Sequence, residues 1–234
     1  MSLSVELLAF TPEPDKVVAA SARLCYSDVS ACSLKEGMDE RKSEKLLEHL
    51  LKSGHMSPFE HVAFTFAMDG LSRVCTHQLV RHRLASYSQQ SQRYVLMGNP
   101  QVVVPPSIAE DAALRERYME MVQKSFDTYK LLVESGVPKE DARYILPHSW
   151  ETRIVVTMNA RELHHFFGLR LCKRAQWEIR EVARRMLALA REKAPMIFNM
   201  AGPACVVSGK CKEATSCGNP YTTVEEVLAD VLDF

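Results

Sequence analysis

The stretch RHRLASYSQQSQRY, Arg81 to Tyr94, places three arginines and three serines within fourteen residues. Guanidinium groups this close together repel one another unless anions or acids neutralise them. Apart from Asp69, no acidic residue lies between Glu60 and Glu110, so the neutralising partner is not local. Arginine offers planar, forked donors that match phosphate oxygens, and serine hydroxyls can complete such a cradle. The stretch therefore predicts a nucleotide or phosphate site.

A solvated basic loop, or one paired with acids from elsewhere in the chain, is the competing interpretation. Two features favour a ligand instead. The stretch contains no lysine, and the residues between the arginines are small hydrogen-bonding groups. Residues Ala85 to Gln92 are polar and show neither the helical nor the strand period, so the sequence predicts a loop there.

The flanking segments carry ordinary strand and helix signals. Val62, Phe64, Phe66 and Met68 alternate with smaller or polar residues, which predicts one buried face of a strand. Capping signals open several of the predicted helices. The predicted strands are Val5–Phe10, Val62–Met68, Val102–Val104 and Ile154–Met158. The predicted helices are Pro14–Leu24, Ser43–Ser53 stopped by Gly54, about Leu71–Val80, Ser107 with Glu110 to about Glu134, one opened by Asn159 with Glu162, about Arg174–Lys193, and one opened by Thr223 with Glu226.

These elements mix without the regular alternation of a doubly wound sheet, so the predicted class is α+β. The chain has 234 residues, which fits one domain spanning residues 1–234. Its 29 basic and 29 acidic residues argue against nucleic acid as the main partner. Seven scattered cysteines, an N-terminus without a signal peptide and no membrane-length apolar run predict a cytoplasmic protein with reduced thiols and no membrane partner.

The arginine-rich stretch resembles the signature of flavin-dependent thymidylate synthases, RHR-x-x-S-(x)4-S-x-R. Two further segments resemble the same family: HMSPFEH from His55 to His61, and NARELHHFFGLRLCKRAQWEI from Asn159 to Ile179. Gln78 also stands three residues before Arg81, as it does in the family. The resemblance runs from about residue 55 to 195. The signature positions matched are Arg81, His82, Arg83, Ser86, Ser91 and Arg93.

The resemblance implies a fold, a reaction and an assembly. The expected protein is one compact domain with a mainly antiparallel sheet, assembled as a homotetramer with shared active sites. It would convert dUMP to dTMP with 5,10-methylenetetrahydrofolate as carbon donor and reduced FAD as hydride source. NADPH would reduce the flavin, and no cysteine nucleophile would be used.

The resemblance also implies residue roles. Arg170 is expected to polarise the uracil ring, because a fixed cation stabilises the negative charge that develops there. His55 is expected near the flavin as a second catalytic candidate. The implied dUMP ligands are Gln78, Arg81, Gln89, Gln90, Ser91, Gln92, Arg93, Arg143 and Arg170. The implied FAD ligands are Ser57, Arg81, His82, Arg83, Leu84, Gln89, Asn159, Arg161 and His165.

The sequence departs from some family members at Ser88, Gln89 and Arg174, where asparagine, an acid and histidine occur. Glutamine cannot act as a base, so the hydrogen bonding around the ligands is expected to differ in detail. No metal is expected, because Cys205, Cys211 and Cys217 are spaced more widely than zinc ligands usually are.

Two other functions stay open from the residues alone. One is an RNA- or nucleotide-binding module that stacks bases on Tyr87 and Tyr94. The other is a pyrimidine enzyme that uses one of the seven cysteines as a nucleophile.

Overall fold

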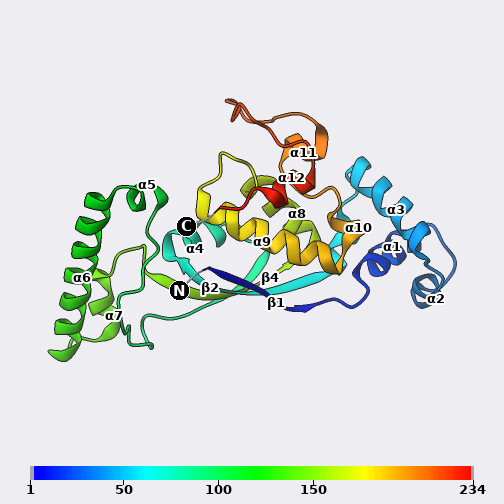
Figure 1. The fold of residues 1–234 in the computed structure, drawn as a ribbon. Helices are drawn as coiled ribbons and strands as arrows, with labels where there is room; N and C mark the ends of the chain where they lie inside the picture. The colour runs from blue at the N-terminus through cyan, green and yellow to red at the C-terminus, as the bar shows by residue number, and fades with distance from the viewer. Residues whose placement is uncertain (1–2, 233–234) are drawn as a thin grey trace.

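A four-stranded antiparallel sheet organises the computed structural model, which describes residues 3–232 (Figure 1). Its strand order is β1-β2-β4-β3, so β2 and β4 are central. The strands are β1 (Ser4–Phe10), β2 (Ala63–Ser72), β3 (Ala85–Gln89) and β4 (Glu151–Asn159). The helices are α1 (Pro14–Leu24), α2 (Ala31–Glu36), α3 (Glu40–Ser53), α4 (Arg73–Leu79), α5 (Pro106–Ala109), α6 (Ala112–Glu134), α7 (Lys139–Ala142), α8 (Ala160–Arg170), α9 (Trp177–Lys193), α10 (Pro195–Phe198), α11 (Ala204–Ser208) and α12 (Val224–Ala229), with 3-10 turns η1 (Ser57–His61) and η2 (Arg143–Ile145).

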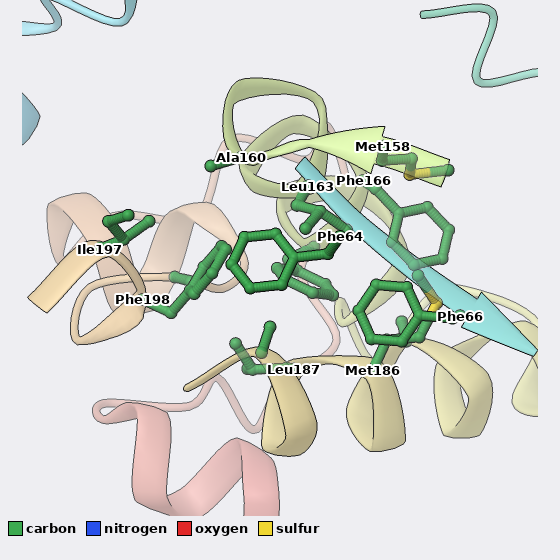
Figure 2. Packing of buried hydrophobic residues seen from close by; sticks show 14 of the residues in the cluster. Phe64, Phe66, Met158, Ala160, Leu163, Phe166, Met186, Leu187, Ile197 and Phe198 are labelled. Atoms are coloured by element: carbon green, nitrogen blue, oxygen red, sulfur yellow. The ribbon is translucent and has the colours of Figure 1, made fainter. Parts of the chain in front are cut away.

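The alternating residues of β2 form the centre of the main core, as their pattern predicts. Phe64, Phe66 and Met68 are completely or almost completely buried. Phe66 pairs with Val156 of β4, which is equally buried. Helices α8 and α9 lie across this apolar face (Figure 1), and Phe198 packs edge-on against Phe64 at 5.4 Å between ring centroids (Figure 2). The predicted α+β class is confirmed, with helices packed on an antiparallel sheet.

Helix boundaries follow the capping chemistry at most ends. The Asn159 side chain accepts a hydrogen bond from the Glu162 backbone at the start of α8, and Thr223 does the same for Glu226 at α12. Gly54 ends α3 with a φ of 73°, in the left-handed region that glycine accepts without strain. These predicted caps are confirmed.

Three predictions from the sequence are wrong. Ala85–Gln89 is a strand rather than a loop, because it pairs with β4 and because its inward Tyr87 and Gln89 find polar partners. Val102–Val104 forms only an isolated bridge between Val102 and Trp150. Ser107 lies inside the short α5, and Asp111 caps the long helix α6 instead.

A second, smaller core lies under α6, at one end of the molecule (Figure 1). Because α7 and η2 are attached to this small core, it places Glu140 and Arg143. Its buried members are Met97, Tyr129, Ala142, Leu146 and Trp150. Among the described residues, no helix combines the length and the apolar character that a membrane crossing needs.

Candidate functional site

The signature stretch is split by β3 into two ends. Tyr87, in the middle of the strand, donates its hydroxyl to the carbonyls of Leu79 at 2.8 Å and His82 at 2.7 Å. These bonds tie β3 to the end of α4 and to the turn that follows it. The residue His82 before the strand contacts Glu162 and Arg170 of α8, while Arg93 after the strand contacts Glu140 of α7.

Arg170, at the end of α8, joins the first half of the signature. Its Nε donates to Nε2 of His82 at 3.1 Å, and an Nη donates to the carbonyl of Gln78 at 3.4 Å. Gln78 in turn donates its side-chain amide to Gln176, which caps α9. Arg170 is half-buried in this network, so it does not form the exposed helix-end pair that an isolated arginine would be expected to make.

His82 is buried and contacts Glu162 as well as Arg170. Its Nδ1 lies 3.3 Å from a carboxylate oxygen of Glu162, whose side chain is also buried. Burial, with a smaller contribution from the nearby charges of Arg170 and His165, lowers the pKa of His82 to about 4. The imidazole is therefore neutral at neutral pH. Burial raises the pKa of Glu162.

The second half of the signature meets the small core. Arg93 donates its Nε to Glu140 at 2.7 Å, and Arg143 donates its Nε to the Glu140 carbonyl at 3.0 Å. The backbone N–H of Arg93 also donates to the Ser91 hydroxyl. Pairing with a distant acid, the competing interpretation of the arginines, thus holds for Arg93 in this state.

Arg73 lies near Arg143, at the end of the site that holds Arg93, and it was not predicted from the sequence as a site residue. One of its terminal nitrogens, Nη1, is buried and has no hydrogen-bond partner among the described residues. Burial lowers the pKa of Arg73, and the charge of Arg143 nearby lowers it further. A buried guanidinium donor beside a second cation has the chemistry to bind an anion. Its one sequence signal was its place on the helix that carries Gln78.

The glutamines of the signature take up different positions. Gln89 points inward and donates to the hydroxyls of Thr76 at 3.1 Å and Thr152 at 3.3 Å. Gln90 donates its backbone N–H to the Arg153 carbonyl, and Gln92 is buried. Gln89 is therefore held by neutral hydroxyls, which suits an amide at this position as well as an acid.

The residues expected to bind the flavin do not all lie together: His165 is beside His82, whereas His55 and Ser57 are in another cavity. His165 lies next to His82, with 5.5 Å between ring centroids, and Arg161 forms an ion pair with Glu60. His55 and Ser57 line a separate cavity of about 330 Å³ against α1 and α3, which no residue of the signature lines. Asn159 caps α8, while Arg81, Arg83 and Leu84 are exposed.

Burial disfavours the thiolate form at two of the cysteines. Cys75 is fully buried and burial raises the pKa of its thiol well above the usual range. The pKa of Cys172 is raised for the same reason. Cys172, Cys205 and Cys211 line a cavity of about 550 Å³. Among residues 3–232, one group of three possible metal ligands lies within 4.8 Å of one another: His82, Glu162 and His165. Arg170 already occupies Nε2 of His82, which disfavours a cation there.

The fold and this geometry define an α+β protein with an arginine-rich candidate site. The family model described as "Thymidylate synthase complementing protein" (Thy1) matches residues 6–196. A relative from Geobacter sulfurreducens named flavin-dependent thymidylate synthase is 49% identical, covering 92% of this chain and 94% of the relative. One of the same name from Pyrococcus furiosus is 46% identical, with 89% of each chain covered. The chain belongs to the flavin-dependent thymidylate synthase family, and it is an enzyme of the methyltransferase class.

A solved structure extends the comparison. The UMP/dUMP methylase PolB from Streptomyces cacaoi, crystallised with 5-Br dUMP, is 27% identical to this chain. It superposes with a TM-score of 0.77 and covers 84% of this chain and 93% of its own.

Proposed function

We propose that this chain converts dUMP to dTMP, with 5,10-methylenetetrahydrofolate as carbon donor and FAD, reduced by NADPH, as hydride source. It would do so in the cytoplasm as a homotetramer with shared active sites, without a cysteine nucleophile. The proposal rests on the end of the site that holds Arg73, Arg93 and Arg143. A buried Arg73 nitrogen without a partner suits the phosphate of a nucleotide. Arg143 lies near Arg73, and Arg143 and Arg93 both bond Glu140.

The other end suits the pyrimidine. The guanidinium of Arg170 is held between His82 and the Gln78 carbonyl, which leaves a fixed positive charge in a half-buried place. A cation held in this way stabilises negative charge on a ring without having to reorganise. Arg170 would therefore polarise the uracil. The proposed dUMP ligands are Gln78, Arg81, Gln89, Gln90, Ser91, Gln92, Arg93, Arg143 and Arg170.

The residues around His82 suit a flavin dinucleotide. Exposed cations and the apolar, largely exposed Leu84 stand beside the buried imidazole, which gives an anion-binding rim with an apolar contact. When bound, the flavin would supply the hydride. The residues proposed to hold it are Ser57, Arg81, His82, Arg83, Leu84, Gln89, Asn159, Arg161 and His165, with His55 near it.

Individual residues of each competing function are placed unfavourably for it. At Cys75 and Cys172 the raised pKa values oppose a reactive thiolate. The hydroxyl of Tyr87 is bonded to two backbone carbonyls, so its half-buried ring is fixed inside the protein. Tyr94 alone of the two tyrosines is largely exposed and open to a stacked base.

The deciding assay is dTMP formation by the purified full chain from dUMP, methylenetetrahydrofolate and NADPH, with and without added FAD. Product that depends on both NADPH and FAD is the expected result. A folded protein that gives no product under any condition would contradict the proposal. Binding of single-stranded RNA with a steep salt dependence would then support the binding-module alternative.

Arg81→Ala tests the shared ligand. Arg81 is exposed and forms no ion pair among residues 3–232, so its loss should leave the fold intact. We expect weaker retention of both dUMP and flavin, by about tenfold or more, because charge-assisted hydrogen bonds are lost. Calorimetry and flavin absorbance report the two ligands separately. Arg191→Ala, which removes an arginine paired with Glu225, is the control.

A further inference from the structure

The sequence predicts Glu162 only as a helix-capping residue with Asn159, and that role does not involve its carboxylate. It occupies the first turn of α8, and the capping bond there runs from its backbone N–H to Asn159 at 2.8 Å. The side chain is free of that bond. It is directed instead at His82, and both side chains are almost completely buried. A buried carboxylate is unfavourable unless it is hydrogen-bonded, so this contact needs an explanation.

The contact with Arg170 determines where the proton of His82 lies. Arginine can only donate, so Nε2 of His82 must accept from Arg170 Nε. A neutral imidazole with a lone pair at Nε2 carries its proton at Nδ1. That proton faces the Glu162 carboxylate at 3.3 Å. The hydrogen bonds therefore run in one direction, from Arg170 to His82 and from His82 to Glu162.

The surroundings leave little freedom for another arrangement. His165 and Phe166 pack against the imidazole, at 5.5 Å and 4.9 Å between ring centroids. On the other side, the Tyr87 hydroxyl holds the His82 carbonyl. If the proton moved to Nε2, two donors, His82 Nε2–H and Arg170 Nε–H, would face each other and the guanidinium would have to turn away.

We propose that Glu162 is a positioning residue. By accepting the Nδ1 proton, it holds His82 in the tautomer that accepts from Arg170, and this fixes the guanidinium for its action on the pyrimidine. The role of the guanidinium rests on the proposed function, but the tautomer does not. Carboxylate, imidazole and guanidinium together also leave no net charge in the buried segment, since one negative and one positive group flank a neutral ring.

Two variants separate the charge from the hydrogen bond. Glu162→Ala removes the acceptor, and we expect turnover to fall about ten- to hundredfold, because small displacements of a reacting group have effects of this size. Glu162→Gln keeps an oxygen that accepts from Nδ1–H, so we expect turnover within about threefold of wild type. Glu226→Ala is the matched control, because Glu226 has the same position in the capped first turn of α12. It should leave turnover unchanged.

The tautomer is measured directly by nitrogen NMR of the full chain labelled at histidine, with His82 assigned through a His82→Gln variant. We expect Nδ1–H in the wild type and in Glu162→Gln, and loss of that state in Glu162→Ala. Isothermal titration with dUMP should show weaker binding for Glu162→Ala only.

The results distinguish failure of the positioning role from failure of the proposed function. Nε2–H in the wild type, or full turnover and dUMP affinity in Glu162→Ala, would overturn the positioning role. Equal losses in Glu162→Ala and Glu226→Ala would show that Glu162 contributes only through helix stability, which also overturns it. Absence of dTMP formation in the wild type would instead count against the proposed function, while the tautomer would still be tested.

Discussion

The two ends of the proposed nucleotide site are supported by different parts of the fold. The pyrimidine end joins Arg170, His82 and Glu162 through buried or half-buried contacts on the main core. The phosphate end joins Arg93 and Glu140 by an exposed ion pair beside the small core. One end is therefore fixed before a ligand arrives, and the other is held by a contact that a ligand can replace.

The difference follows from what each end must do. A guanidinium that stabilises developing charge gains from being held rigidly, since no reorganisation is then needed during the reaction. A phosphate contact mainly contributes binding, and exposed ion pairs contribute little to stability, so their exchange for a phosphate is easy. Variants at the two ends should accordingly differ in which kinetic constant they change.

Arg170→Ala should give the largest effect. We expect turnover to fall by about a thousandfold or more, in line with the loss of a single preorganised donor, while the fold and flavin content are kept. Steady-state kinetics measures the turnover, and circular dichroism reports whether the fold is kept. Arg191→Ala is again the control, because this arginine pairs with Glu225 and has no place in the proposed site. Normal turnover in Arg170→Ala would show that Arg170 has no catalytic role.

Arg73→Ala should act on the other end. We expect dUMP affinity to fall about ten- to hundredfold, because a charge-assisted bond to phosphate contributes roughly 1.5–3 kcal/mol. Losing the unpartnered Nη1 costs the apo protein no hydrogen bond. Titration with deoxyuridine, which lacks the phosphate, should show no change. Equal losses for both ligands would mean that Arg73 does not face the phosphate.

Acid should destabilise the fold through two histidines, His82 after α4 and His164 of α8. The pKa values of His82 and His164 are both lowered to about 4 by burial. The unfolded chain then binds more protons between pH 6.5 and 4, so the stabilisation is complete above pH 6.5 and is lost as the pH falls toward 4. We expect each histidine to remove about 2 kcal/mol between pH 7 and 5, an effect opposed by the raised pKa of Glu162.

Urea midpoints at pH 7 and pH 5 measure this loss. His164→Gln should reduce the difference between them, because one titrating group is removed. His164 makes its hydrogen bond to the Ile197 carbonyl, away from Arg170, so dUMP binding at pH 7 should be kept. An unchanged pH dependence in this variant would show that His164 is not the titrating group.

The two ends also differ in how far the sequence predicts them. Phe64, Phe66 and the Asn159 cap follow from local periodicity and capping, so the main core and α8 are predicted correctly. The strand β3 shows no alternation of apolar and polar residues, because the inward side chains of Tyr87 and Gln89 carry polar groups. These groups are bonded by partners from α4 and β4.

Distant contacts explain the remaining misses. Glu162 is visible in the sequence only as a capping residue, since its bond to His82 spans 80 positions. The same holds for Glu140, which lies 47 positions from Arg93. No local pattern encodes a pair that only the tertiary fold brings together. The buried nitrogen of Arg73 is likewise a property of packing.

Glu140→Gln should give the smallest effect and tests whether the phosphate end is exchangeable. If Glu140 occupies Arg93 until a phosphate replaces it, removing the charge should tighten dUMP binding by about twofold, as expected for an exposed pair. Deoxyuridine affinity should stay constant, and so should turnover at saturating dUMP, because the pyrimidine end is untouched. Weaker dUMP binding would mean that Glu140 orients Arg93 toward the ligand rather than competing with it, and both ends of the site would then be preorganised.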